Sequence, residues 1–328
     1  MIDEKREHYN EHKHNTIRIK TLTNGETIKT MDIKNITKAE EIQGEEGLFN
    51  IPDSLYHKSC GISKSSLDPI NKSPLHYKYA REQEMVETAA MTFGSLCHLI
   101  ALEPEALDDS IAYGPDCERR SKADKATWID WWADTEGKIR LTHDGFLVAK
   151  DEKGTIKKDS TLSIARAKNI VKSVMEHPLA KDYMTRPGVN EVAIFSKDQE
   201  TNILKRGKID RLCVESGCIV DLKTTSDSSV KGFMKSIFGF NYHAQASYYL
   251  DMANEQGLDV NKFIFVVVEK VRPYSVSVFE IDAYSIAAGR KQYRKNLKLL
   301  SKCIDSDFWP SHNDNKLIVT EKPSWIEC

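Results

Sequence analysis

The stretch GKIDRLCVESGCIVDLKTT, residues 207–225, places three charged side chains in two runs that otherwise have the character of buried strands. Asp210 lies in the first run, and Asp221 and Lys223 lie two residues apart in the second. Ser216-Gly217 between the runs predicts a hairpin turn. A charge in an apolar strand costs free energy unless it is paired, solvated or bound to a metal ion.

The predicted hairpin brings the three charged side chains together. Because side chains alternate across a strand, Asp221 and Lys223 share one face. If Glu215 pairs with Cys218, Asp210 lies opposite Lys223 and diagonal to Asp221. A register shift of one residue would send Asp210 to the other face. We therefore expect all three side chains on one face of the sheet.

Two carboxylates at one point repel each other and favour a bound cation. Their hard oxygen ligands favour Mg²⁺, and Mn²⁺ is expected to substitute for it. A lysine beside such an ion can orient the attacking water or stabilise charge on a phosphate. For an isolated Asp-x-Lys, the alternative is a salt bridge on a solvated sheet face. Both interpretations remain open on this stretch alone.

The composition is that of a globular protein: 328 residues, 40% hydrophobic and 29% charged. No apolar run approaches the roughly 20 residues of a membrane span, and the charged N-terminus lacks the apolar core of a signal peptide. These features predict a cytoplasmic protein. The net charge of −2 argues against a protein that coats DNA by charge alone, but not against an enzyme with a local basic groove.

The pattern of elements predicts an α/β fold with a mixed central β-sheet flanked by helices. Residues 1–45 are interpreted as a polar leader with a β-hairpin at Asn24-Gly25, and residues 46–328 as one domain. Residues 106–160 are expected to be loop-rich. Strands are predicted at 191–196, 203–214, 218–224, 263–270 and 274–281, and helices from Ser63 or Ser65, at 89–102, 160–184, 241–257 and 284–303.

Five short motifs follow one another in an order that resembles the RecB-type branch of the PD-(D/E)XK nucleases. They are GSLCH at 94–98, Glu191, GKID at 207–210, DLK at 221–223 and QASYY at 245–249. Residues 46–328 also resemble the nuclease domain of the exonuclease VIII (RecE) family. That narrower resemblance rests on GISKSSLDPINKSPLHYKYA, FGSLCHLIALEPEA and QYRKNLKLLSKCIDSDFWP. The usual proline before the motif aspartate is Ile209 here.

The resemblance implies a PD-(D/E)XK core and a role for each motif residue. Asp210 and Asp221 are assigned as metal ligands, and Lys223 as the residue that positions or activates water. By resemblance, His98, Glu191 and the main-chain carbonyl of Leu222 complete the metal site. Gln245 and Tyr249, which share a helix face, are expected to contact phosphate or a base.

Three of these residues also have a simpler interpretation. A single histidine on an apolar helix face is often a hydrogen-bonded core residue, which is the alternative for His98. Glu191, taken alone, would be a solvated residue at the start of a strand. Tyr249 could simply pack its helix against the sheet.

Two groups of basic residues are candidates for contact with DNA. Arg290, Arg294 and Lys298 form an i, i+4, i+8 stripe on the predicted C-terminal helix, either a phosphate-contacting row or a solvated outer face. Arg119 and Arg120 precede a segment that contains three tryptophans. This second group could hold a frayed DNA end by charge and stacking, or anchor a surface insertion.

The resemblance implies an Mg²⁺-dependent exodeoxyribonuclease that digests linear duplex ends from 5′ to 3′. Such an enzyme leaves 3′ single-stranded tails for recombination by annealing. A toroidal homo-oligomer, expected to be a tetramer, a single-strand annealing partner of the RecT type and a phage or prophage gene in a bacterial cell are also implied. The alternatives are a RecB-like endonuclease of defence or restriction type and a catalytically silent DNA-binding assembly module.

Overall fold

A nine-stranded mixed sheet forms the centre of the computed structural model, which describes residues 16–23, 27–37, 42, 44–83, 87–151, 153–313 and 316–322. The strand order is β1-β2-β3-β9-β10-β11-β12-β13, with β4 paired to β10. The strands are β1 Thr16–Thr23, β2 Thr27–Asn35, β3 Gly47–Asn50, β4 Ile62–Ser63, β9 Val189–Lys197, β10 Leu204–Cys213, β11 Cys218–Thr225, β12 Lys262–Glu269 and β13 Val276–Glu280. The predicted α/β class with a mixed central sheet is confirmed.

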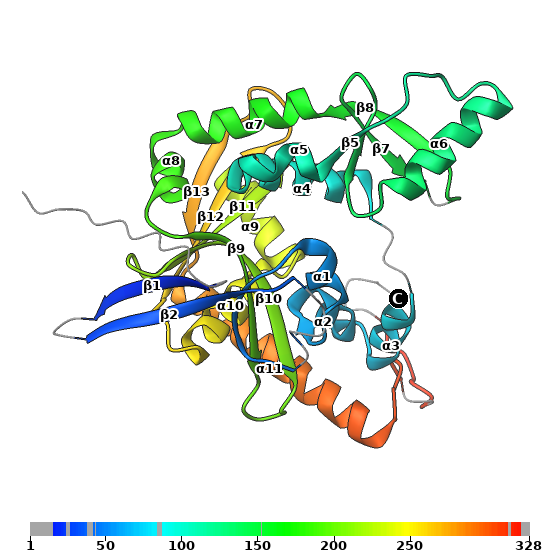
Figure 1. Cartoon of the computed structure of the whole chain (residues 1–328). Coiled ribbons are helices and arrows are strands. Elements are labelled where there is room, and N and C mark those ends of the chain that lie inside the picture. Colours follow the sequence, from blue (N-terminus) through cyan, green and yellow to red (C-terminus); the bar gives the residue numbers. More distant parts are fainter. Residues whose placement is uncertain are drawn as a thin grey trace, which may run out of the picture.

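Helices cover both faces of this sheet (Figure 1). They are α1 Asp53–Lys58, α2 Lys64–Leu67, α3 Pro74–Glu82, α4 Ala89–Leu102, α5 Leu107–Ser110, α6 Lys122–Asp134, α7 Ile164–Glu176, α8 Pro178–Thr185, α9 Val230–Gly239, α10 Tyr242–Glu255 and α11 Ala283–Ser306. None of the helices in the described ranges has both the length and the apolar character of a membrane span.

Alternating residues of β11 divide the core into two layers. Val220 and Leu222 pack with residues of α4 and α7, whereas Ile219 packs with residues of α9, α10 and α11. β12 is buried on both faces, which explains its continuous apolar run. The strand that carries Asp221 and Lys223 is therefore packed between two layers of buried apolar residues.

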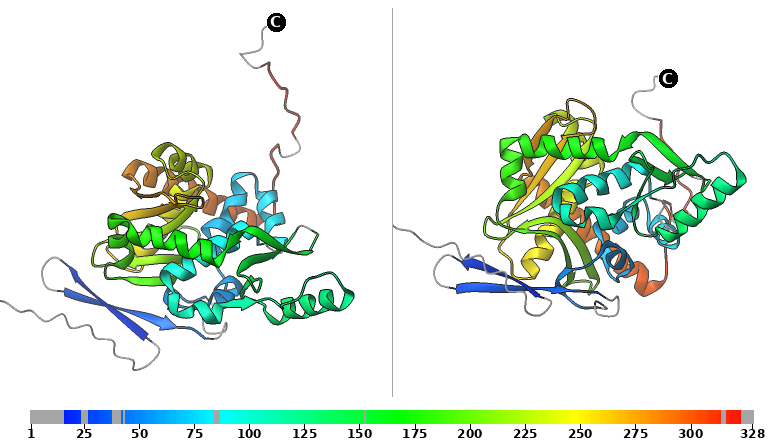
Figure 2. Two further views of the ribbon diagram at one scale, coloured as in Figure 1. Left: turned by 90° about the horizontal axis from the view of Figure 1, so that it is seen from above. Right: turned by 45° about the horizontal axis from the view of Figure 1, so that its top comes forward.

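A second sheet of four strands lies in the segment that was expected to be loop-rich. It comprises β5 Ile111–Tyr113, β6 Ile139–Leu141, β7 Phe146–Lys150 and β8 Ile156–Ser163. Together with α6 it forms a small module, residues 111–163, that projects away from the central sheet (Figure 2). Three of its strands are only three to five residues long, so their pattern is weak in the sequence.

Two further predictions about the elements need correction. The helix predicted at 160–184 begins only at Ile164, where Ser163 caps α7, and it breaks at Pro178, where α8 starts. The helix α9 was not predicted. By contrast, α4 has the predicted bounds, and Ser63 is the N-cap of α2.

The predicted N-terminal hairpin is present as two antiparallel strands, with Thr23 opposite Thr27. Its turn residues Asn24 and Gly25 lie outside the described residues. β2 also pairs with β3 in parallel, so the hairpin joins the central sheet at its edge. A domain boundary at residue 45 remains a prediction.

Gly207 permits a close approach between β10 and α10. A Cβ atom at this position would lie 2.7 Å from Cε1 of Tyr249, far inside the usual contact distance. The glycine of the GKID motif thus lets the tyrosine ring pack flat against the strand that carries Asp210.

We predict that Gly207→Ala lowers the free energy of unfolding by about 1–3 kcal/mol, because overpacking forces the strand or the ring to move. Gly94→Ala is the control, since a Cβ there meets nothing within 4 Å and alanine favours a helix. Urea denaturation of both variants measures the effect. Equal stability of the two variants would contradict this packing argument.

Candidate active site

The strands β10 and β11 pair only over a short distance and then separate. Their last regular pair is Arg211 opposite Val220, and the turn between them spans residues 214–217. The turn is longer than predicted, so the predicted register was wrong by two residues. Continued along the strands, the observed register places Asp210 opposite Asp221.

Where the two strands separate, side chains instead of the neighbouring strand form hydrogen bonds with the backbone of Leu222. The amide of Leu222 donates to Oδ2 of Asp210 at 2.8 Å. Nε2 of His98, on α4, lies 2.7 Å from the carbonyl oxygen of Leu222, and its Nδ1 lies 3.4 Å from Oδ2 of Asp210. His98, Asp210 and the Leu222 backbone therefore form one connected group.

Asp221 is almost completely buried, with 1% of its surface exposed. Its Oδ1 accepts a hydrogen bond from Nε2 of Gln245 on α10, at 2.9 Å. Its Oδ2 lies 2.7 Å from Nζ of Lys223, yet it forms no hydrogen bond of acceptable geometry within the described residues. Both oxygens of this buried carboxylate therefore have a close polar neighbour.

The three motif side chains reach the gap from both sides of the sheet. Asp210 contacts His98 of α4, whereas Asp221 contacts Gln245 of α10 and Lys223 lies below the ring of Tyr242 of α10 at 4.9 Å. The expectation of one shared face in a regular hairpin is therefore wrong in this detail. The side chains converge because the strands separate, not because the pleat aligns them.

Glu191 faces Asp210 across the neighbouring strand pair. The register on either side, Ile209 with Val192 and Arg211 with Asn190, places the two carboxylates opposite each other. Glu191 is the third residue of β9, not the first residue of a strand as predicted. Its φ of 51° lies in the left-handed region, which is unfavourable for a residue with a side chain and marks a local distortion of the strand.

His98, Glu191 and Asp210 each offer a ligand atom within 4.8 Å of the others. Burial raises the pKa of Asp210, and the Asp221 carboxylate raises it further, although His98 opposes this. Burial and the Asp210 carboxylate likewise raise the pKa of Glu191. Burial lowers the pKa of His98, but Asp210 and Glu191 outweigh it, so the net shift is upward. The site carries excess negative charge that a cation would stabilise.

The donor set fits a divalent metal ion of the hard type. The group within 4.8 Å contains the carboxylates of Glu191 and Asp210 with His98, and Asp221 lies outside it but acts electrostatically on Asp210. The carbonyl oxygen of Leu222 contacts His98 beside this group. Oxygen-rich sets of this kind suit Mg²⁺ and Mn²⁺. The metal roles of these residues remain a hypothesis that their positions support.

Gln245 and Tyr249 share one face of α10 but have different contacts. Gln245 bonds directly to Asp221, which places it at the site. The ring of Tyr249 packs against Gly207 of β10. The contacts of Tyr249 favour the packing interpretation, while contact with phosphate or a base remains a prediction.

Two residues at the site were missed in the sequence. Lys208 forms ion pairs with Glu191, at 3.0 Å, and with Asp53. Tyr242 covers Lys223. The spacing of both residues in the sequence could have indicated them. Lys208 is two residues before Asp210 on a strand, and Tyr242 is three residues before Gln245 on a helix, so each is expected on the same face as its motif residue.

The basic stripe of α11 is occupied by carboxylates of its own chain. Arg290 binds Asp251 through Nε and Nη2 at 2.6–3.0 Å, and Arg294 lies 3.7 Å from the same carboxylate. Lys298 pairs with Glu200 at 2.6 Å. These pairs favour a structural contribution, and contact with DNA remains a prediction.

Arg119 and Arg120 belong to the small module, away from the carboxylate cluster. The guanidinium of Arg119 lies 4.7 Å from the ring centre of Trp128 and donates a hydrogen bond to the carbonyl of Ile156. Arg120 is exposed and pairs with Glu118. Arg119 therefore anchors α6 to β8, as the insertion interpretation expected, and a DNA contact by either residue remains a prediction.

Comparison with known proteins bears on the fold and the family of the chain. No curated protein matches the chain. Among solved structures, the chain resembles a crystal structure titled "Putative exonuclease" from Eubacterium rectale, with a TM-score of 0.52 and 13% sequence identity, covering 80% of this chain and 91% of that one. At this identity the likeness concerns the fold.

Residues 63–319 match a family described as "PDDEXK-like domain of unknown function (DUF3799)". This range includes every motif residue from His98 to Tyr249 and the whole of the small module. The fold is that of the PD-(D/E)XK nucleases, and the chain belongs to this family of PDDEXK-like domains.

Proposed function

We propose that this protein is a metal-dependent nuclease that hydrolyses DNA. The observation that carries the proposal is the group of His98, Glu191 and Asp210, whose ligand atoms lie within 4.8 Å of one another beside the buried Asp221–Lys223 ion pair. A structural salt bridge with Lys223 would leave no reason for two further carboxylates and a histidine at the same point.

In the proposed site, Asp210, Asp221, Glu191 and the Leu222 carbonyl hold the metal ion, with His98 beside them. When bound, a divalent ion supplies Lewis-acid stabilisation of charge on the phosphate. Lys223 is suited to orienting water and to stabilising negative charge, because Asp221 and Asp210 raise its pKa despite its burial and keep it protonated. Gln245 holds the Asp221 carboxylate in position through its hydrogen bond.

The finer part of the proposal is an exodeoxyribonuclease of the exonuclease VIII (RecE) type. It would act from 5′ to 3′ on linear duplex ends with Mg²⁺ and leave 3′ tails for a single-strand annealing protein of the RecT type. A toroidal homo-oligomer in the bacterial cytoplasm, encoded by a phage or prophage, belongs to the same proposal. Its support is the resemblance of residues 46–328 to that family.

The requirement for an end can be tested directly. We expect linear duplex DNA to be degraded in Mg²⁺ and covalently closed circles of the same sequence to stay intact, because an enzyme that starts at an end needs one. Substrates labelled at the 5′ or the 3′ end report the polarity, and EDTA is the metal-free control. Rapid cutting of closed circles would instead favour an endonuclease.

Asp221→Asn separates chemistry from binding. Asparagine retains an acceptor oxygen for Gln245 but removes the charge that would hold the metal ion. Loss of about 4 kcal/mol of transition-state stabilisation corresponds to roughly a thousandfold slower cleavage. DNA affinity in EDTA should stay equal or rise, since a negative charge is removed. Single-turnover rates and equilibrium binding measure the two effects, and cleavage at the wild-type rate would end the assignment.

Metal binding should also be visible without DNA. An ion present at about a hundred times its dissociation constant adds about 2.7 kcal/mol of stability to the folded state. We expect Mn²⁺ to raise the thermal midpoint of the wild-type protein and to have little effect on Asp210→Asn. Asp182→Asn, which changes an exposed carboxylate paired with Arg186, is the matched control and should retain the full shift. A full shift in Asp210→Asn would argue against metal binding at this site.

A further inference from the structure

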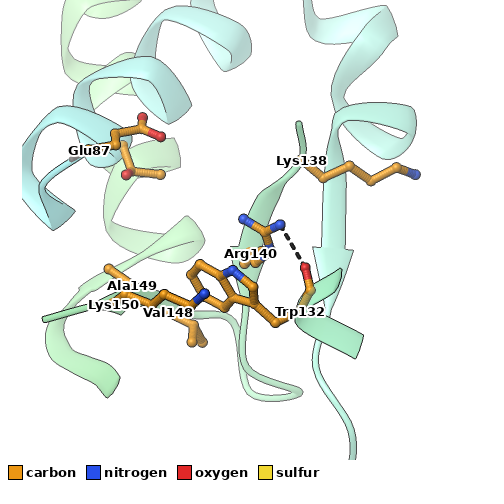
Figure 3. A pocket seen from close by; sticks show the side chains of 8 residues that line it. Glu87, Trp132, Lys138, Arg140, Val148, Ala149 and Lys150 are labelled. Atoms are coloured by element: carbon orange, nitrogen blue, oxygen red, sulfur yellow. Dashed lines mark hydrogen bonds between the residues drawn. The ribbon is translucent and has the colours of Figure 1, made fainter. Parts of the chain in front are cut away.

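The small module carries a cavity of its own, apart from the carboxylate cluster (Figure 3). Its volume is about 260 Å³, close to the lower end of the size range of small-ligand pockets. We call it the Arg140 pocket. Its charged and aromatic lining comprises Glu87, Trp132, Lys138, Arg140 and Lys150.

Arg140 is held in a fixed position in this pocket. Its Nη2 donates to the carbonyl of Trp132 at 2.9 Å, and its Nε donates to Oγ1 of Thr135 at 2.8 Å. Its guanidinium carbon lies 4.0 Å from the centre of the Trp132 ring. No hydrogen bond from Nη1 to another described residue is present. A guanidinium that is oriented in advance and retains a free edge is well suited to bind a phosphate oxygen.

The pocket has an excess of positive charge. Lys150 lies 4.9 Å from the same indole ring, and neither Lys138 nor Lys150 pairs with a carboxylate among the described residues. Glu87 is the one carboxylate in the lining, against three cations. Burial lowers the pKa of Arg140, although Glu136 and Glu87 oppose this, so an anion in the pocket would stabilise the guanidinium.

A second, more open hollow of about 530 Å³ continues from the first and shares Glu87, Ala149 and Lys150 with it. It extends along β7 and β8 past Lys153, Lys157 and Lys158. Two of these lysines are partly neutralised, by Asp151 and Asp144 at 2.7 Å each. Glu87, Asp151 and Asp159 also line the second hollow, so its charge is mixed, but the two hollows together are larger than a single phosphate group requires.

The helix α4 links this surface to the candidate active site. Thr92 lines the Arg140 pocket, and His98 lies six residues further along the same helix. Six residues advance about 9 Å along a helix axis. That distance is roughly three nucleotides of a strand with a rise of about 3.4 Å per nucleotide.

We propose that the Arg140 pocket binds a phosphodiester group of a DNA strand whose end lies in the active site. Arg140 contacts the phosphate through Nη1, Lys138 and Lys150 add positive charge, and the apolar wall formed by Val148 and Trp132 contacts the sugar or base. This proposal rests on the proposed function in one respect, namely that the bound strand is the substrate of the nuclease. A free mononucleotide has the same chemistry, but the second hollow continues from the pocket along β7 and β8, and this extended shape favours a strand.

The test is equilibrium binding of a labelled single-stranded oligonucleotide to the full chain in EDTA, over a series of salt concentrations. We expect Arg140→Ala to weaken binding about tenfold and to reduce the salt dependence by about one phosphate contact. Arg140→Lys should retain part of the affinity that Arg140→Ala loses, because lysine keeps the positive charge but not the planar guanidinium group. Lys150→Ala, an exposed change that leaves the core intact, should weaken binding about threefold. Lys172→Ala removes an equally exposed charge on α7 and should have no effect.

Two results would overturn the proposal. One is wild-type affinity and salt dependence in both Arg140→Ala and Lys150→Ala. The other is an Arg140→Ala variant that binds the oligonucleotide with unchanged affinity but from which a deoxynucleoside monophosphate no longer displaces it. That result would identify a mononucleotide site. Binding in EDTA is independent of cleavage, so a protein that binds through Arg140 but does not cut DNA would refute the proposed function alone. Cleavage with normal binding in the Arg140 variants would refute the pocket alone.

Discussion

The hydrogen bond from the Leu222 amide to the Asp210 carboxylate determines the shape of the site. At this point the β10–β11 ladder has ended, and a side chain satisfies a backbone donor that would otherwise be buried without a partner. The same peptide unit contacts His98 through its carbonyl. One residue of β11 thus connects a strand, a helix and a carboxylate, and it does so because the two strands separate.

This separation has a cost that the surrounding charges offset only in part. Asp221 and Glu191 each have a lysine partner, Lys223 and Lys208, whereas Asp210 has His98 as its close partner and is affected by Lys223 and by the Asp221 carboxylate in opposite directions. Buried carboxylates in a low-dielectric environment are expensive when they are incompletely paired. Apolar residues at these positions would often be equally or more stabilising, so the presence of several carboxylates at one point favours a chemical role.

The sequence was sufficient for the motifs and for the central fold because those features depend on local patterns. The bounds of α4, the strand assignments around Asp210 and Asp221, and the Gln245–Tyr249 face all follow from periodicity. The hairpin register did not follow, because residues 214–217 form a turn whose length no local pattern specifies. The contact of Asp210 with His98 of α4 joins positions far apart in the sequence, and the left-handed backbone of Glu191 has no local sequence signal. The module of residues 111–163 was missed because three of its strands are only three to five residues long.

The contact of Asp251 on α10 with Arg290 and Tyr293 on α11 has a consequence for genetic analysis of this protein. Asp251 is mostly buried and accepts hydrogen bonds from Arg290 and Tyr293, and it lies six residues beyond Gln245 on the same helix. A variant that loses Arg290 leaves a buried charge poorly compensated and disturbs the helix that positions Gln245. A screen for loss of activity would therefore recover Arg290 even if that arginine never touches DNA. Loss of activity in α11 variants would therefore first indicate that α11 holds α10 and the active site in place. It would not by itself show that α11 binds nucleic acid.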